Sequence, residues 1–157
     1  MNHVITPAPV RKTFTVRATP ERAFEVFATC MGQWWLKSHS LGKSPLKDVQ
    51  IEPWAGGRWY EQGEDGGECQ WGHVKAWEPP GRLLLAWRLD AEWKFNPELH
   101  TEIEVRFLPE GTGHTRVEFE HRHLERFGAK AAEVAKALDS DGGWTGLLAA
   151  YAALLRQ

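Results

Sequence analysis

The segment DGGWTGLLAAYAALL, residues 141–155, decides the fold of this chain. Its large apolar side chains recur three or four positions apart, which is the spacing of one face of an α-helix. We therefore predict a C-terminal helix, with Asp141 as a candidate N-cap. A helix that carries Trp144, Tyr151 and four leucines on one stripe needs a broad apolar surface to cover it. The preceding segments indicate that this surface is a sheet.

Most of the chain between Asp48 and Arg122 has the patterns of antiparallel strands. Residues 101–107 and 115–121 alternate apolar with polar side chains, as half-buried strands do. Glu64–Gly67 has the composition of a hairpin turn, and such turns join neighbouring antiparallel strands. Strands and helices do not alternate regularly, which argues against a doubly wound parallel fold. We predict an antiparallel meander.

The N-terminal part predicts a strand over residues 10–16 and then a helix. Thr19 has the side chain of an N-cap, and Pro20 suits the first helical position. Helical spacing continues as far as Met31, and Gly32 is expected to end the helix. The pair Trp34–Trp35 is expected in the connection that follows.

Length and composition predict one globular domain over residues 1–157, and they exclude several classes of function. The net charge of −2 and the scattered basic residues are unlike a nucleic-acid-binding surface. The first ten residues lack a signal-peptide pattern, and no apolar run could span a bilayer. Cys30 and Cys69 are too few and too far apart for a zinc or redox motif. We expect a cytoplasmic protein with reduced thiols and no membrane association.

The tryptophan content is unusual, with nine in 157 residues. Tryptophan supplies a large apolar area and one N–H group that needs a partner when buried. Nine of them indicate either a core of large aromatic rings or a cavity with aromatic walls. Composition alone does not separate the two.

Several short motifs occur along the chain in a specific order. They are Thr19–Phe27, Trp34–Trp35, Gly56–Trp59, Gly72 with Val74, Glu78–Leu83, Trp87, Phe119–His121, and Gly143–Trp144 with Leu147. Together they resemble the START-like (SRPBCC) helix-grip superfamily, and most of all its branch named for the activator of the heat-shock chaperone ATPase. The resemblance extends from about Val10 to Leu155.

The resemblance implies an α+β helix-grip fold. In that fold a curved antiparallel sheet of about seven strands surrounds a long C-terminal helix, and two short helices lie between strands 1 and 2. The stretch between His121 and Gly143 departs from the family pattern because it is longer and more helical, with an Ala-rich helical segment over 127–138. We therefore expect a differently shaped pocket entrance.

A long helix that crosses a curved sheet can enclose a cavity, and we predict that this cavity binds a small apolar, aromatic ligand. The candidate ligand-binding residues face inward in the predicted strands or lie on the inner stripe of the helix. They are Trp59, Val74, Leu85, Trp87, Val105, Phe119, His121, Trp144, Leu148 and Tyr151. The facing of residues 69–77 stays open, because either Trp71 and His73 or Gly72 and Val74 could point inward.

His121 ends an otherwise apolar inward face. It either orients a ligand and transfers a proton, or it is a core histidine that is hydrogen-bonded within the fold. On a strand His121 and His123 would share a face and could supply two metal ligands. No spacing supplies a third ligand, so we expect no bound metal.

Three glutamates are candidate acid–base groups. Glu61 shares a face with Trp59 and would be of interest if it were buried. Glu102 and Glu104 lie opposite the apolar face of their strand, so we expect them in solvent.

Three functional hypotheses follow. We favour a small-molecule-binding module over a cavity enzyme of the cyclase or hydrolase type, because the sequence has no nucleophile elbow, phosphate loop or dinucleotide fingerprint. For the same reason we expect no cofactor. The branch name suggests a co-chaperone, but the family members that stimulate the chaperone carry a further N-terminal domain, so we do not expect a chaperone partner here. A homodimer stays open.

Overall fold

The computed structural model describes residues 8–36, 39 and 41–156. The elements in chain order are β1 (Val10–Val16), α1 (Pro20–Ala28), α2 (Met31–Trp34), β2 (Leu46–Ile51), β3 (Arg58–Gly63), β4 (Glu68–Glu78), β5 (Arg82–Trp87), β6 (Thr101–Pro109), β7 (Thr115–Arg122), the 3₁₀ segment η2 (Leu124–Lys130), α3 (Ala131–Leu138) and α4 (Trp144–Leu155).

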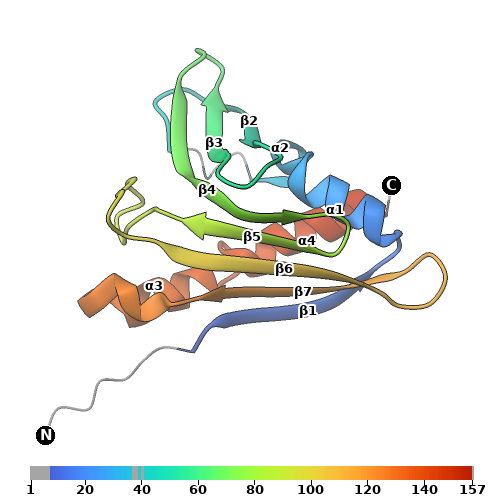
Figure 1. The fold of residues 1–157 in the computed structure, drawn as a ribbon. Helices are drawn as coiled ribbons and strands as arrows, with labels where there is room; N and C mark the ends of the chain where they lie inside the picture. The colour runs from blue at the N-terminus through green and yellow to red at the C-terminus, as the bar shows by residue number, and fades with distance from the viewer. Residues whose placement is uncertain (1–7, 37–38, 40, 157) are drawn as a thin grey trace, which may run out of the picture.

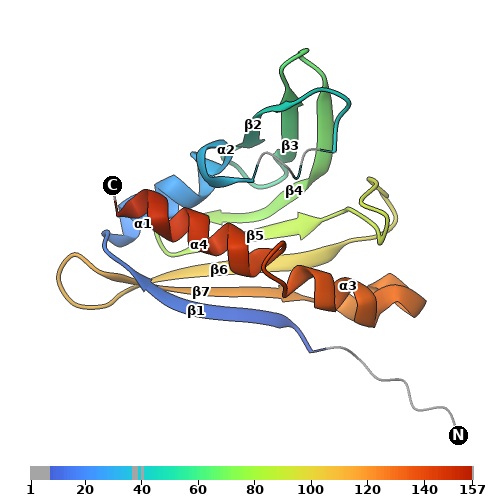
Figure 2. The same ribbon diagram turned by 180° about the vertical axis from the view of Figure 1, so that it is seen from behind.

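The strands form one seven-stranded antiparallel sheet in the order β1-β7-β6-β5-β4-β3-β2. The sheet curves, and α4 lies across its concave face with α1 and α2 near the C-terminal end of α4 and α3 near the N-terminal end (Figures 1 and 2). This arrangement confirms the predicted α+β helix-grip fold, including the two short helices between strands 1 and 2.

The first residue of helix α4 contacts the sheet through its aromatic ring and through a hydrogen bond. The ring centroid of Trp144 lies 4.7 Å from that of Phe119 and 5.8 Å from that of Trp87. The indole Nε1 of Trp144 also donates a hydrogen bond of 3.1 Å to Nδ1 of His121. At the other end of the helix, the Tyr151 hydroxyl donates to the carbonyl oxygen of Ala23 in α1 at 2.7 Å. In each half of α4, one buried aromatic side chain, Trp144 or Tyr151, therefore both packs in the core and donates a hydrogen bond.

The predicted helix boundaries were wrong in two places. Helix α1 already ends at Ala28, and Gly32 lies within the separate short helix α2, which also contains Trp34. The N-cap of α4 is Gly143 rather than Asp141. A Cβ atom on Gly143 would lie 2.4 Å from the carbonyl oxygens of both Ala137 and Leu138, so only glycine fits where the chain leaves α3 and enters α4.

The segment expected as one Ala-rich helix over 127–138 is divided. Residues Leu124–Lys130 form the 3₁₀ segment η2, and Gly128 adopts a left-handed φ of 67° that interrupts the helical path before α3. Glycine adopts this φ readily, whereas other residues do so at a cost.

An irregularity in β4 answers the open question about its facing. Trp59 pairs with Gly72 while Tyr60 pairs with Gln70, which leaves Trp71 as an extra residue in the strand. A bulge of this kind turns the side chain of the extra residue. Trp71 and Val74 are both 1% exposed and Gly72 is also buried, whereas His73 is half-buried. The buried residues are therefore Gly72 and Val74 of one alternative and Trp71 of the other.

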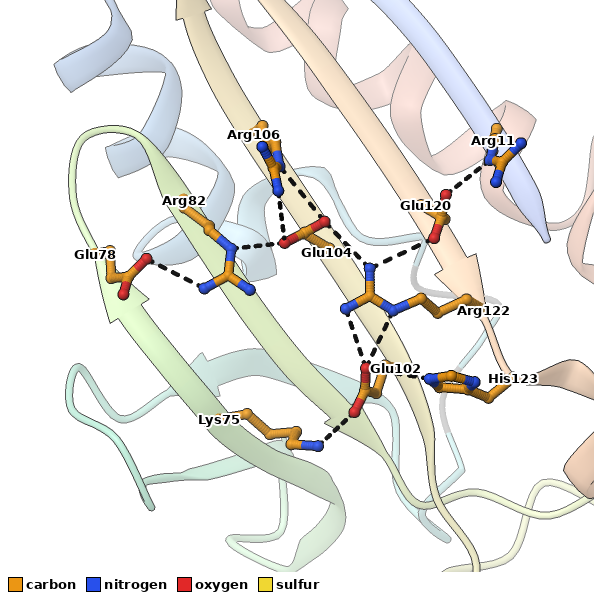
Figure 3. A network of polar contacts seen from close by, with 10 residues as sticks. All are labelled: Arg11, Lys75, Glu78, Arg82, Glu102, Glu104, Arg106, Glu120, Arg122 and His123. Atoms are coloured by element: carbon orange, nitrogen blue, oxygen red, sulfur yellow. Dashed lines mark hydrogen bonds and ion pairs between the residues drawn. The ribbon is translucent and has the colours of Figure 1, made fainter.

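The outer face of the sheet carries an ion-pair network rather than isolated charges (Figure 3). Arg122 on β7 contacts Glu102 at 3.0 Å and Glu104 at 3.1 Å on β6. Lys75 is a second partner of Glu102, and Arg82 lies 2.6 Å from Glu104. Both glutamate side chains are only 12% exposed, so the expectation that they lie in solvent was wrong. The cross-strand partners cover them.

The network predicts acid sensitivity. Although burial raises the pKa of Glu102, the hydrogen bonds from Lys75 and Arg122 lower it from 4.5 to about 2. A carboxyl whose pKa is lower in the folded than in the unfolded state stabilises the fold at neutral pH, and this contribution is lost as pH falls from about 5 to about 2. We expect Glu102→Gln to lose about 2 kcal/mol of unfolding free energy at pH 7 and little at pH 2, allowing for solvent screening. Urea unfolding of both proteins across this range measures the difference, and a difference independent of pH would contradict the prediction.

The packing of α4 gives a second prediction. We expect Trp144→Ala to lower the unfolding free energy by about 3–5 kcal/mol, because it removes a buried large aromatic ring and the donor to His121. Trp54→Ala is the control, since Trp54 is 55% exposed and its loss should change stability by no more than about 0.5 kcal/mol. Denaturant unfolding measures both, and a loss below about 1 kcal/mol for Trp144→Ala would contradict the docking of α4 described above.

Candidate functional site

A cavity of about 370 Å³ lies beside the N-terminus of α4. It is bounded by α4, the end of α3, strands β4 and β5, and the connections that precede β2 and follow β5. The described residues that line it are Trp35, His39, Leu41, Trp71, Trp87, Leu89, Trp93, Ala137, Leu138, Ser140, Gly142, Gly143, Trp144 and Leu147. Five of the nine tryptophans in the chain are therefore in its wall.

The tryptophan rings of the wall contact one another edge to face or at a tilt. Trp71 lies 4.7 Å from Trp35, Trp35 lies 5.7 Å from Trp144, and Trp144 lies 5.8 Å from Trp87, measured between ring centroids. Such geometries are the favoured ones for aromatic pairs, so the rings hold one another in place. The aromatic wall is thus held together by contacts among its own rings.

His121 lies in the core and does not line the cavity. Its Nδ1 accepts from Trp144, so the proton of the neutral ring is on Nε2, which donates to Oγ1 of Thr101 at 2.7 Å. Burial lowers the pKa of His121 to about 3, which keeps the ring neutral. With both nitrogens bonded, His121 orients Trp144. Of the two alternatives for His121, the structure therefore shows the core histidine, and it is hydrogen-bonded to the side chains of Trp144 and Thr101.

The expectation that His121 and His123 share a face was wrong. His123 follows the end of β7 with a left-handed φ of 66°, and its Nε2 lies 3.4 Å from Glu102 on the outer face. This conformation separates the two imidazoles. Within residues 8–36, 39 and 41–156, no group of three or more His, Cys, Asp or Glu side chains could hold a metal.

Glu61 is buried, with 1% of its surface exposed, and it supports the cavity wall. Its carboxylate accepts hydrogen bonds from Nε1 of Trp71 at 3.0 Å and from the backbone N–H groups of Leu41 at 2.7 Å and Gly42 at 3.2 Å. Trp71 and Leu41 both line the cavity. Glu61 therefore positions two parts of the wall that are far apart in sequence.

Only two of the ten predicted ligand-binding residues, Trp87 and Trp144, line the cavity. The other eight are buried in the core around it: Trp59, Val74, Leu85, Val105, Phe119, His121, Leu148 and Tyr151. Sequence reasoning missed the residues contributed by loops and helix ends. The signal that could have found Trp35 and Trp93 is a large aromatic side chain in a segment otherwise expected to be a connection.

Among the described residues, no helix is long and apolar enough to cross a membrane. Cys30 and Cys69 are both free thiols.

The chain is similar to several solved structures. The anthrahydroquino-γ-pyrone synthase Txn09, solved in complex with SUM, is 41% identical, with 95% of this chain and 97% of that chain covered and a TM-score of 0.67. CalC from Micromonospora echinospora, a self-sacrificing resistance protein, is 30% identical, with 94% and 93% covered and a TM-score of 0.67. The Aha1 dimer from Colwellia psychrerythraea shares the fold at 16% identity, with 95% and 96% covered and a TM-score of 0.62.

No curated protein shows significant similarity to the chain. The family model described as "Activator of Hsp90 ATPase homolog 1-like protein" matches residues 17–156. That match covers strands β2 to β7 and all of α4, whereas β1 lies before it. The chain therefore belongs to the Activator of Hsp90 ATPase homolog 1-like family, within the SRPBCC superfamily.

Proposed function

We propose that this protein binds a small planar aromatic molecule in the cavity beside the N-terminus of α4. The observation that carries the proposal is the wall itself, in which five indole rings surround about 370 Å³ of space. This volume lies within the range of about 300–1,000 Å³ that is typical of small-molecule sites. Flat rings could stack or meet edge to face with the indoles, which a flexible aliphatic chain could not do.

The name of one relative supports a fused-ring ligand. The synthase at 41% identity is named for an anthrahydroquino-γ-pyrone, which is a fused aromatic ring system. The resistance protein at 30% identity has the same fold. The similarity to the synthase extends over 95% of this chain.

A second candidate function is catalysis on a ligand of the same class, and the similarity to a synthase favours it. Among the described residues that line the cavity, His39 is the one with an imidazole, a side chain that can donate or accept a proton. Its Nε2 lies 2.6 Å from the carbonyl oxygen of Gly142, and because a carbonyl only accepts, this nitrogen carries a proton. His39 is therefore the residue that we would expect to transfer a proton in such a reaction.

Filling the cavity tests the binding proposal. Ala137 lies on the exposed side of α3 and lines the cavity, so Ala137→Trp places a bulky ring in the opening without disturbing the core. We expect this change to weaken binding of 1,8-dihydroxyanthraquinone at least about ten-fold, measured by isothermal titration calorimetry. Ala132→Trp is the matched control, because Ala132 is exposed on the same helix but does not line the cavity.

Equal affinity of Ala137→Trp and Ala132→Trp would show that the probe binds elsewhere. Chromatography of the recovered probe separates binding from catalysis. An unchanged compound supports a binding module, whereas a new product that His39→Ala no longer forms supports the enzyme.

A further inference from the structure

Trp93 combines an unusual backbone conformation with a position at the mouth of the cavity. It lies in the connection between β5 and β6, has a left-handed φ of 63° and is 40% exposed, yet its side chain lines the cavity. A bulky residue rarely adopts this φ, and a turn that only reversed the chain would use Gly, Asn or Asp here. The chain thus accepts both backbone strain and a half-exposed indole at this position.

The strained conformation is held by the turn around it. Oδ1 of Asp90 accepts hydrogen bonds from the backbone N–H groups of Glu92 at 2.9 Å and Lys94 at 3.0 Å. The backbone N–H of Asp90 donates to the carbonyl oxygen of Lys94 at 2.9 Å, and that of Trp93 donates to the carbonyl oxygen of Asp90 at 3.0 Å. Asp90 therefore bonds to residues on both sides of Trp93 and fixes its backbone.

The base of the connection is fixed to the sheet. Nη1 of Arg88 donates to the carbonyl oxygen of Pro97 at 2.6 Å, and its Nε donates to Nδ1 of His73 on β4 at 3.0 Å. Leu89 and Phe95 form an isolated antiparallel bridge. These contacts hold the turn over the end of β5, so the fold itself determines where the Trp93 ring lies.

The Trp93 ring continues the aromatic wall outward to solvent. Its centroid lies 6.2 Å from that of Trp87, with the planes at 80°, and Trp87 in turn contacts Trp144. Trp144 is 1% exposed, Trp87 4% and Trp93 40%. The three rings lead from the core to the cavity mouth, and of the three Trp93 is the one with a large solvent-exposed surface.

We propose that Trp93 is the specificity-determining residue of this site. It covers the open side of the cavity and selects flat aromatic ligands by stacking on them. The inference rests on the proposed binding function and adds the residue that discriminates between ligands. Stacking on a ligand would remove the exposed indole from water, which offsets the strain of presenting it there. A bulky saturated ring system could fill the same space but would not offer a flat face to Trp93.

The test compares two probes and matched variants. Trp93→Gly removes the ring at a φ that glycine adopts freely, so the turn is preserved. We expect it to weaken binding of 1,8-dihydroxyanthraquinone about ten-fold and to leave binding of deoxycholate, a bulky saturated ring system, unchanged or tighter, both measured by isothermal titration calorimetry. Trp54→Ala is the control, since Trp54 is exposed and does not line the cavity.

Asp90 provides a second variant that keeps the ring. Asp90→Ala removes the acceptor for two N–H groups and should lower affinity for the flat probe, whereas Asp90→Asn retains an acceptor oxygen and should restore it. Thermal unfolding of each variant is the control that checks whether the fold is retained. A residue with a merely structural role would change the unfolding midpoint and leave the ratio of the two affinities unaltered.

The outcomes are distinguishable from failure of the proposed function. If the wild-type protein binds the flat probe and Trp93→Gly binds it equally well, the role of Trp93 is overturned while the binding function stands. If Trp93→Gly weakens both probes equally, the ring adds only apolar area and the selection is overturned. If the wild-type protein binds neither probe, the proposed function and this inference both fail.

Discussion

The hydrogen bond from Trp144 to His121 and the tilted contact of the Trp144 ring with the Phe119 ring are the contacts on which the rest of the structure depends. They fix the first turn of α4 on the concave face of the sheet. They also determine the protonation of His121, because a nitrogen that accepts from an indole cannot carry a proton, and Thr101 then accepts from the other one. Since one face of Trp144 belongs to the core and another to the cavity, the stability of the fold and the shape of the site share this residue.

The cavity is apolar inside, but polar contacts behind its wall determine its shape. Glu61 is the clearest case, because a buried carboxylate needs donors, and it obtains them from Trp71 and from the backbone of Leu41 and Gly42. A charged residue in the core therefore orients an apolar ring in the wall. The same holds for Asp90, which is placed outside the cavity and shapes the turn that carries Trp93. Apolar contacts alone do not specify these positions.

The sequence predicted the fold where periodicity is strict. Alternation identified the buried faces of β6 and β7, because side chains on a regular strand point to opposite sides in turn. It failed where the backbone departs from regularity, as at the bulge that turns Trp71 inward and at the left-handed His123. Most of the residues that it proposed for the site lie deeper than the cavity. Inward-facing residues such as Val105 fill the core, whereas the empty space lies where strands and helices end and depends on the shapes of loop side chains.

The connections therefore distinguish this site within a shared fold. The sheet and α4 are common to a wide family, but the open side of the cavity is formed by the connection before β2, the turn that carries Trp93, and the segment that joins α3 to α4. Adjacent to the last of these segments, the end of α3 places Ala137 and Leu138 in the wall. Loops on a rigid scaffold can change without loss of the core. Residues of those three connections would therefore determine a ligand preference specific to this chain. The contact between Trp144 and His121 would meanwhile hold α4 on the sheet in the same way.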